Sequence, residues 1–439
     1  MSREMKHSGI EWIGEIPKEW KTISFSNGIL RMSTGLNPRD NFELSKDDEY
    51  YYVTIKNFKD GKIYLDDNCD RISKQAWRII QERSQLEKGD ILFASISKDG
   101  QAYILEEPPV NWNINESVFC IRTNHDYFFD KYFYYHIIDS QFYNDLRLDA
   151  TGTTFQSIKQ NKLRKSTLCT PPLNEQQKIA DYLDKVCGEV DELVTLQEQM
   201  IEELKAYKQS VITEAVTKGL NPNAPMKDSG VDWIGEIPVR WEVKKIKYLS
   251  NVVRGGSPRP AGDTRYYEGD IPFMKVADIT KDENIYVNSC EYTIKEAGLS
   301  HTRTVLPGTL LLTNSGATLG VPKINTFKTT FNDGIAAFLN IDKELDVIFA
   351  YYSLKARTKH FLESASLGIG QPNLNTDIIG NTPLLLPPLS EQQAIASYLD
   401  TKCTEIDSLI AIKQQKIEEL KEYKKSVIYE YITGKKEVV

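Results

Sequence analysis

The sequence predicts an α+β protein in which two globular, mostly β lobes are separated by two long antiparallel helices that form a coiled coil. Two observations predict this architecture. Blocks of the first half recur in the second half at a nearly constant offset, and each half ends in a long segment with a heptad pattern of apolar residues. A tandem duplication therefore relates the halves, and we expect a pseudo-two-fold between them. The chain has 439 residues, of which 40% are hydrophobic and 26% charged, as in globular proteins of several domains.

The repeat opens with a tryptophan-rich block. Residues 8–20 read SGIEWIGEIPKEW and residues 229–241 read SGVDWIGEIPVRW, an offset of 221. A second block, PPLNEQQ at 171–177, recurs as PPLSEQQ at 387–393, an offset of 216. The nearly constant offset indicates a duplicated unit that occupies half of the chain.

Each lobe is predicted to be mostly β. A strand-like run lies at 50–56 in the first half and at 271–276 in the second. A turn signal then precedes a short apolar strand, in KGDILF at 88–93 and in PGTLLL at 307–312. Short aromatic-rich runs between Gly and Pro signals are typical of small β lobes.

Two further features complete the outline of a lobe. A Gly/Gln loop ends each one, at 152–156 and at 368–371, and a minor helix is expected around 130–145. The lobes are accordingly placed at residues 1–170 and 220–386.

Residues 171–219 and 387–439 are predicted to form the two long helices. IEELKAYKQSVI at 201–212 matches IEELKEYKKSVI at 417–428, and apolar residues recur at spacings of three and four. This heptad seam predicts coiled-coil packing, and ~45 residues at 1.5 Å each make a helix of roughly 65 Å. The seam consists of Val190, Val194, Ile201, Leu204 and Val211 in the first helix and Ile406, Ile410, Ile417, Leu420 and Val427 in the second.

Both helix starts carry a capping signal. In each half a Pro-Pro pair stops the last strand of the lobe. Asn174-x-x-Gln177 and Ser390-x-x-Gln393 are then expected to act as capping boxes.

The chain order makes the two helices antiparallel, because the first ends where lobe two begins and the second starts where lobe two ends. The C-terminus is therefore expected near residue 8. The seam is interrupted at Gln197 and Lys413, equivalent positions close to the helix midpoints. In an antiparallel pair these side chains face each other, so the amide oxygen can accept from the ammonium. We predict that this pair fixes the register of the rod.

No catalytic or cofactor motif emerges from the sequence. The chain contains no P-loop, no G-x-G-x-x-G after a strand, no Asn-Pro-Pro-aromatic tetrapeptide and no paired histidines at metal-ligand spacing. Its 6 cysteines are scattered, without a C-x-x-C pair. Glu242-Val243-Lys244 fits a nuclease triplet alone, without a partner carboxylate. We therefore expect a non-catalytic protein without a metal site.

From its charge and hydropathy we expect a cytoplasmic protein with no role for a membrane. The net charge is −8, and most of the excess acid falls in the two predicted helices. The lobes are nearly neutral, with 23 basic against 25 acidic residues in the first and 18 of each in the second. No window approaches the ~18 apolar residues of a membrane-spanning helix, and the N-terminus leads into no apolar leader segment. A protein that grips DNA alone usually shows a basic face, which these lobes lack in bulk.

The lobes offer contact chemistry instead. Residues 254–260 read RGGSPRP, a basic loop in which Arg254, Ser257 and Arg259 are suited to phosphate or guanine. The alternative is an ordinary loop with solvated arginines, and Asn37-Pro38-Arg39 is interpreted only as a turn.

Small polar residues follow the equivalent apolar strand of each lobe. They are candidates to read base edges, although simple turn formation explains them equally well: Ser95, Ser97 and Lys98 in the first lobe, and Thr313, Asn314 and Ser315 in the second. Lys56 and Lys275 are expected at equivalent strand ends, each as a phosphate contact.

The repeated blocks resemble a known family. Two copies of PPL[N/S]EQQ leading into an IEELK helix, each behind a divergent lobe opened by WIGEIP, look like the specificity (S) subunit of type I restriction–modification systems. The resemblance covers nearly the whole chain. It implies a non-catalytic subunit with two target-recognition domains, each of which reads one half of a bipartite site in double-stranded DNA. It also implies two methyltransferase (M) subunits and restriction (R) subunits as partners, which would bind S-adenosylmethionine and ATP with Mg in place of this chain.

Two other functions stay open at this point. A self-sufficient DNA methyltransferase or nuclease is disfavoured by the missing motifs. A scaffold that joins two partner subunits without reading DNA fits the helices but leaves the divergent lobes unexplained.

Overall fold

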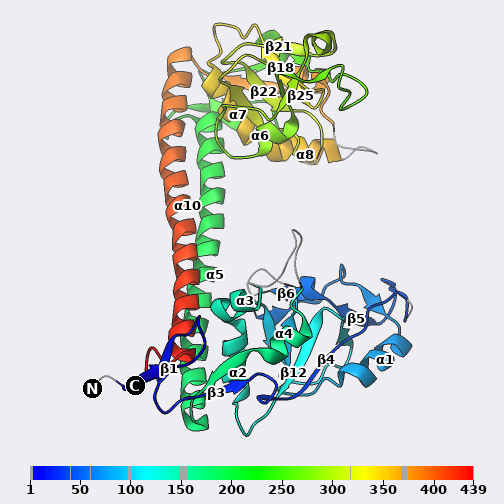
Figure 1. The fold of residues 1–439 in the computed structure, drawn as a ribbon. Helices are drawn as coiled ribbons and strands as arrows, with labels where there is room; N and C mark the ends of the chain where they lie inside the picture. The colour runs from blue at the N-terminus through cyan, green and yellow to red at the C-terminus, as the bar shows by residue number, and fades with distance from the viewer. Residues whose placement is uncertain are drawn as a thin grey trace. The chain divides into compact units, whose positions relative to one another are not determined.

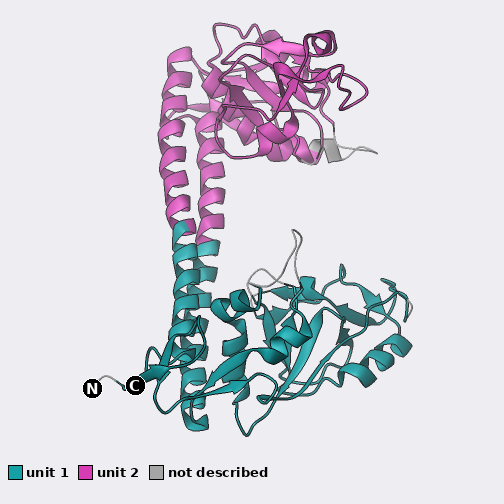
Figure 2. Ribbon diagram, viewed as in Figure 1, with its two compact units in different colours: residues 1–198, 415–439 teal, residues 199–414 magenta. Residues whose placement is uncertain are grey.

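The computed structural model describes residues 3–39, 41–59, 61–96, 100–147, 157–316, 318–366 and 373–438. The chain divides into two compact units, coloured separately in Figure 2: unit 1 is Met1–Glu198 with Gln415–Val439, and unit 2 is Gln199–Gln414. Each unit holds one sheet-rich lobe and part of both long helices, α5 (Leu173–Lys218) and α10 (Leu389–Ile432). Two mostly β lobes and two long helices are the predicted fold class, which is confirmed.

The lobe of unit 1 is built on two sheets (Figure 1). An antiparallel sheet has the order β10 (Ala102–Ile104), β9 (Ile91–Ala94), β12 (Val118–Thr123), β4 (Ile29–Thr34). A mixed sheet has the order β11 (Trp112–Ile114), β5 (Tyr50–Val53), β8 (Arg71–Ile72), with β11 and β5 parallel. Its two-stranded pairs and helices are β1 (Met5–His7) with β2 (Glu15–Pro17), β3 (Lys21–Ser24) with β13 (Thr167–Thr170), β6 (Phe58–Lys59) with β7 (Lys62–Ile63), η1 (Ile55–Asn57), α1 (Lys74–Ser84), α2 (Asp130–Ile138), α3 (Ser140–Arg147) and α4 (Gln160–Lys165).

The lobe of unit 2 repeats this plan with more strands. One sheet has the order β17 (Asn251–Arg254), β25 (Ile335–Leu339), β22 (Leu310–Thr313), β23 (Pro322–Asn325), β19 (Tyr286–Val287). The other has the order β20 (Tyr292–Ile294), β18 (Tyr267–Met274), β24 (Thr329–Phe331), β21 (Arg303–Val305). The remaining elements are β14 (Met226–Asp228) with β15 (Glu236–Pro238), β16 (Glu242–Lys245) with β26 (Pro383–Leu386), η2 (Ile246–Tyr248), α6 (Val276–Thr280), η3 (Glu296–His301), α7 (Val347–Ala356), α8 (Thr358–Ser366) and α9 (Thr376–Asn381).

The apolar strands predicted after the turn signals are the central strands β9 and β22, and every residue of both is buried. The helix expected around 130–145 is two helices, because the carboxylate of Asp139 accepts from the backbone N–H groups of Gln141 and Phe142 and so starts α3. The Gly/Gln loops at 152–156 and 368–371 lie outside the described residues.

The capping boxes predicted at the helix starts are wrong. α5 begins at Leu173, where the carbonyl of Pro172 accepts from the N–H groups of Glu175 and Gln176, at 2.9 and 3.0 Å. α10 begins in the same way at Leu389, so the residues expected as caps lie inside the first turn of each helix. The reason is that a proline at a helix start has no N–H group that needs a partner. The Pro-Pro pair can therefore begin each helix without a side-chain cap.

A buried glutamine, rather than a capping box, fastens each long helix to its lobe. Gln176 is 0% exposed, and its amide nitrogen donates to the carbonyls of Tyr127 and Pro171 while its oxygen accepts from the N–H of Phe129. Gln392, at the equivalent position of the repeat, likewise bonds the lobe of unit 2 through three backbone groups, those of Glu344, Asp346 and Pro387.

The two long helices run antiparallel within each unit. In unit 1, Asp191 of α5 forms an ion pair with Lys424 of α10 at 2.7 Å. Earlier in α5, the ring centroid of Tyr182 lies 4.5 Å from that of Tyr431, which comes later in α10. In unit 2 the equivalent pair is Lys208 with Asp407, also at 2.7 Å.

All ten predicted seam residues are buried or half-buried, which confirms the heptad pattern.

The end of α10 packs against the first tryptophan-rich block. The hydroxyl of Tyr429 donates to the carbonyl of Trp12 at 3.1 Å, and the ammonium of Lys435 donates to the carbonyl of Glu15 at 2.6 Å. The end of the chain therefore lies beside residues 12–15, as the antiparallel arrangement predicts.

Candidate nucleic-acid interface

The predicted basic loop of lobe two leaves β17 at Gly255 and crosses the turn at residues 332–334, which leads into β25. A side chain does not fit at Gly255, because a β-carbon there would lie 2.2 Å from the carbonyl oxygen of Asn332. The loop is thus seated directly on backbone, which gives it a fixed course along the surface.

Asp333 organises this loop. Its carboxylate accepts from the hydroxyl of Ser257 at 2.7 Å and from the guanidinium of Arg259 at 3.3 Å, and its carbonyl accepts from Arg254 Nε at 2.6 Å. The side chain of Arg259 is 72% exposed, so its ion pair with Asp333 contributes little to stability. The guanidinium can therefore exchange this carboxylate for a phosphate or for the O6 and N7 of guanine at small cost.

Three of the predicted residues line one hollow in the surface of lobe two. Ser257, Arg259 and Lys275 border a depression of about 370 Å³, whose wall includes an aromatic ring. The ammonium of Lys275 lies 3.1 Å from the ring centroid of Tyr292, in a cation–π contact. Acidic side chains line it as well, namely Glu268, Glu291 and Asp333, so the depression has mixed charge.

Two of the three residues predicted at the end of β22 are closed to solvent. Thr313 and Asn314 are 0% exposed. The hydroxyl of Thr313 donates to the carbonyl of Thr318 and accepts from the N–H of Val321, which closes the turn. Burial argues against direct base contact by these two side chains. Of the three residues predicted here, Ser315 is the half-exposed one, and it lies next to the 332–334 turn.

Among the residues that the structure describes, the buried amide of Asn314 has no hydrogen-bond partner on either atom, and the buried amide oxygen of Asn332 is unpaired as well. Leaving such a group unpaired costs about 1–3 kcal/mol, and native proteins keep few of them. Both asparagines lie beside the basic loop, since Asn314 donates its N–H to the carbonyl of Gly334 at 2.9 Å.

In lobe one the predicted residues are dispersed. Ser95 is 2% exposed, and its hydroxyl accepts from Ser157 at 3.3 Å. Lys56 is exposed. Ser97 and Lys98 lie outside the described residues.

The expected equivalence of Lys56 and Lys275 is wrong. In the parallel pairs of the two lobes, Val53 lies opposite Ile114 and Met274 opposite Phe331, so the next residues, Thr54 and Lys275, correspond. Both of these begin a short helix, and in both the side chain three residues further along, Asn57 or Asp278, accepts from the backbone N–H of this first residue. Lys56 is two residues further along and has no lysine counterpart. The sequence alone suggested that Lys56 and Lys275 are equivalent, because the place of the capped turn relative to the strand is known only once the strand register is known.

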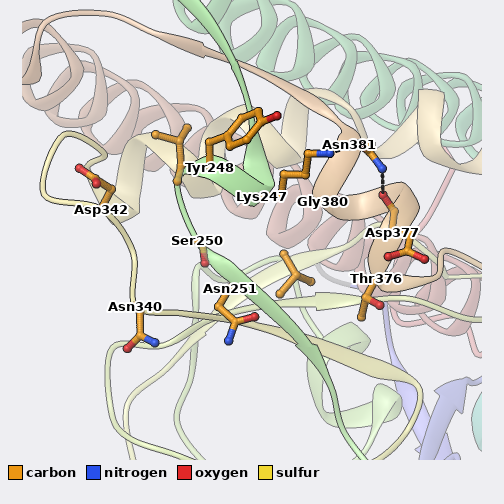
Figure 3. Close-up of a pocket in the computed structure, with 12 residues that line it drawn as sticks. Lys247, Tyr248, Ser250, Asn251, Asn340, Asp342, Thr376, Asp377, Gly380 and Asn381 are labelled. Atoms are coloured by element: carbon orange, nitrogen blue, oxygen red, sulfur yellow. Dashed lines mark hydrogen bonds between the residues drawn. The ribbon is translucent and has the colours of Figure 1, made fainter.

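A larger hollow of about 600 Å³ lies at the opposite end of β17, beside Asn251 (Figure 3). Lys247 crosses it and donates to the amide oxygen of Asn381 at 2.8 Å. Asp342 and Asp377 also line it, so a single cation stands against two carboxylates and the hollow has no excess positive charge for an anionic ligand.

Within the described residues no group of His, Cys, Asp and Glu is arranged to hold a metal ion. In the same part of the chain no helix has the length and apolar character needed to cross a membrane.

Sequence reasoning missed the role of Asp333 and Asn332 in this site. The signal was present as the turn tripeptide Asn332-Asp333-Gly334 just before a strand. What the sequence did not show is that this turn lies under the loop 255–260, because the two segments are far apart in the chain and meet only through β17 and β25.

Comparison with known proteins gives matches along nearly the whole chain. The family model described as the type I restriction modification DNA specificity domain matches twice, over residues 17–206 and 238–422. The putative type I restriction enzyme MjaX specificity subunit of Methanocaldococcus jannaschii is 29% identical over 96% of this chain and 95% of its own. The EcoBI specificity subunit of Escherichia coli is 25% identical over 67% of this chain and 63% of its own.

Solved structures share the fold. A chain from a structure of a type I R-M system, solved to explain its complex assembly and conformational transition, superposes with a TM-score of 0.69 at 19% identity, covering 95% of this chain and 98% of that one. The crystal structure of the HsdS subunit from Thermoanaerobacter tengcongensis gives a TM-score of 0.51 at 18% identity, with the same coverage of 95% and 98%.

Proposed function

The chain belongs to the type I restriction–modification DNA specificity family, and from that premise we propose that its lobes, residues 1–170 and 220–386, each read one half of a bipartite DNA target. A specificity subunit reads the DNA target and assembles with M and R subunits, and it catalyses no step itself. The observation that carries the proposal is the repeated lobe: one sheet plan occurs twice, with different residues on its exposed loops. The matches give no support to a self-sufficient methyltransferase or nuclease, or to a scaffold that ignores DNA.

In lobe two, the proposed DNA contacts are the exposed and half-exposed polar residues around the depression: Arg254, Ser257, Arg259, Lys275 and Ser315. Arginine offers a planar pair of donors to guanine or phosphate, whereas Lys275 offers a point charge. The mixed charge of the depression suits a protein whose partners share the phosphate contacts, since salt-dependent affinity scales with the phosphates neutralised.

In lobe one, Lys56, Ser97 and Lys98 keep their proposed role as DNA contacts. The buried residues Ser95, Thr313 and Asn314 are proposed to shape the loops that carry the contacts rather than to touch DNA.

The proposed docking sites for two M subunits are repeated apolar side chains on the long helices. Each unit exposes two aliphatic residues and one tyrosine at sequence-equivalent positions. They are Leu193 (46% exposed), Leu196 (48%) and Tyr423 (52%) in unit 1, and Leu409 (47%), Ile412 (63%) and Tyr207 (58%) in unit 2. Large exposed apolar residues in such groups mark protein–protein contacts. R subunits would join around the M subunits, and these partner subunits, rather than this chain, would bind S-adenosylmethionine and ATP with Mg.

The helices at 171–219 and 387–439 are proposed to set the spacing of the half-sites, with Gln197 and Lys413 fixing their register. Both side chains are half-buried on the seam side of their helices. Gln197 belongs to unit 1 and Lys413 to unit 2, so their pairing stays a prediction.

The proposed interface is tested by Arg259→Ala in the complex assembled with the M subunits. We expect DNA binding to weaken by about 1–3 kcal/mol with relaxed preference at one base if Arg259 contacts guanine, and the salt slope to fall by about one if it contacts phosphate. Arg240→Ala is the matched control, because this exposed arginine lies outside the loop. Equal binding by the two variants would remove Arg259 from the interface.

A further inference from the structure

We propose that Arg39 is the lobe-one counterpart of Arg259 and contacts the DNA of the first half-site. The inference rests on the proposed function and adds a residue that the sequence analysis interpreted only as part of a turn. It is carried by a comparison of the internal geometry of the two lobes, each taken by itself.

The two loops share a pattern that is short enough to escape notice in the sequence. Residues 35–39 read Gly-Leu-Asn-Pro-Arg and residues 255–259 read Gly-Gly-Ser-Pro-Arg, so Gly, Pro and Arg coincide at an offset of 220. Such a five-residue match has little weight alone, because Gly and Pro are common in turns. The match becomes significant because the two loops occupy equivalent positions in their lobes.

Each loop leaves the same strand of its sheet. Gly35 follows β4, whose last residue, Thr34, lies opposite Phe119 in β12. Gly255 follows β17, whose last residue lies opposite Ala336 in β25. The two loops therefore start from equivalent ends of equivalent edge strands.

The first residue of each loop meets the same obstacle. A β-carbon on Gly35 would lie 1.7 Å from the carbonyl oxygen of Ile114, as one on Gly255 would lie 2.2 Å from that of Asn332. The N–H of Gly35 donates to the carbonyl of Asn115 at 3.1 Å, and that of Gly255 to the carbonyl of Ile335 at 3.0 Å. Both loops are thus pressed onto backbone in or beside the turn that leads into the neighbouring strand, β12 in lobe one and β25 in lobe two.

Both loops are also held from the second sheet by a tyrosine hydroxyl. Tyr52 of β5 donates to the carbonyl of Leu36, and Tyr267 of β18 donates to the carbonyl of Pro258 at 2.9 Å. Leu36 and Phe42 pack against the apolar cluster of Tyr52 on either side of Arg39. The loop is anchored at both ends, which leaves Arg39 exposed at its tip.

The electrostatic setting of Arg39 favours an anionic partner. Within the described part of the chain Arg39 has no hydrogen-bond or ion-pair partner, whereas Arg259 has Asp333. The carboxylate at the corresponding place in lobe one, Glu116, lies instead beside Tyr52, with its Oε2 3.3 Å from the hydroxyl oxygen. A free guanidinium on an anchored loop is suited to phosphate oxygens or to the O6 and N7 of guanine.

The test uses the complex assembled with its M subunits and duplexes that carry its mapped methylation target. Arg39→Ala is expected to weaken binding by roughly 5- to 150-fold, and Arg78→Ala, at an exposed arginine of α1 in the same lobe, is expected to leave binding unchanged. Arg39→Lys distinguishes the two modes: it restores affinity if the partner is phosphate, and it leaves base preference at one position of the first half-site relaxed if the partner is guanine.

Three outcomes separate this inference from the proposed function. Weaker binding by Arg39→Ala, with any loss of base preference confined to the first half-site, supports it. Unchanged binding by Arg39→Ala while Arg259→Ala still weakens binding overturns the inference and leaves the proposed function standing. Loss of preference in the second half-site, with the first unaffected, also overturns it, since Arg39 would then act in the wrong lobe.

Discussion

At the scale of single residues, buried polar side chains of this protein fasten its elements together, whereas its exposed polar side chains are the proposed DNA contacts. Gln176 shows the first role. It satisfies three backbone groups at the junction of lobe one and α5, and it has no contact with solvent. The neighbouring Gln177 is exposed and donates to Asp181, four residues on in the same helix.

These neighbours provide a matched pair of variants. Gln176→Ala leaves several buried backbone groups unpaired, so we expect it to lower the free energy of unfolding by about 2–4 kcal/mol. Gln177→Ala is expected to change it by less than about 0.5 kcal/mol. Urea unfolding of both variants measures the difference, and equal effects would contradict the fastening role of Gln176.

A buried histidine and a buried carboxyl give lobe one opposing pH responses. Burial lowers the pKa of His136 to about 4 and raises the pKa of Asp139 to about 6, from ordinary values of 6.5 and 3.8. The folded state requires the neutral form of His136. The stability that this residue contributes is therefore lost as the pH falls from 6.5 to 4. Asp139 acts in the opposite direction, because its protonation as the pH falls from 6 to 3.8 favours the folded state.

His136→Gln removes one of these two responses. We expect the stability of this variant relative to the parent to rise by about 2–3 kcal/mol between pH 7.5 and pH 4.5, whatever its baseline cost. Unfolding curves at both pH values measure the change, with His125→Gln as the exposed control. A constant difference across this range would contradict a depressed pKa for His136.

At the scale of elements, the sequence predicts best what repeats or alternates. The heptad seam predicted α5 and α10 to within a few residues, and the turn signals before residues 91 and 310 predicted the central strands β9 and β22. The exact helix boundaries depend on other features. The Pro-Pro pair begins each long helix, and the side chain of Asp139 divides one expected helix into two.

The candidate site was less predictable than the elements that carry it. Arg259, Ser257 and Lys275 were identified from residue type alone, and the structure brings all three to one depression. Asp333 and the correspondence of Arg39 with Arg259 depend on strand register, which brings together segments about 75 residues apart and which local sequence does not encode. Thr313 and Asn314 looked like surface residues because small polar side chains after a strand are equally common in turns, and these two are buried.

The register of the long helices is testable by disulfide formation. If Gln197 and Lys413 face each other, Gln197→Cys with Lys413→Cys should form a disulfide on mild oxidation, since this bond requires Cα atoms about 4.4–6.8 Å apart. The control is Gln197→Cys with Leu420→Cys, one heptad or about 10 Å further along. Cross-linking of the control in place of the first pair would contradict the proposed register. The native cysteines in the described residues are buried or half-buried, which limits competing disulfides.

At the scale of the whole molecule, duplication followed by divergence explains how one chain reads two different half-sites. What recurs nearly unchanged is the tryptophan-rich blocks, the helix starts with their buried glutamines and the exposed apolar residues of the helices, which are the proposed docking sites for M subunits. What differs is the surface of each lobe. A change confined to one lobe is therefore expected to alter one half of the target alone.

The measurement that tests this account most directly is the methylated sequence after exchange of one lobe. Residues 21–170 are replaced by the corresponding lobe of a specificity subunit with a different target, the chimaera is co-expressed with its own M subunits, and the methylated sites are mapped. The account predicts that one half of the bipartite site changes while the other half and the spacing between them are kept. A change in both halves, or in neither, would contradict it.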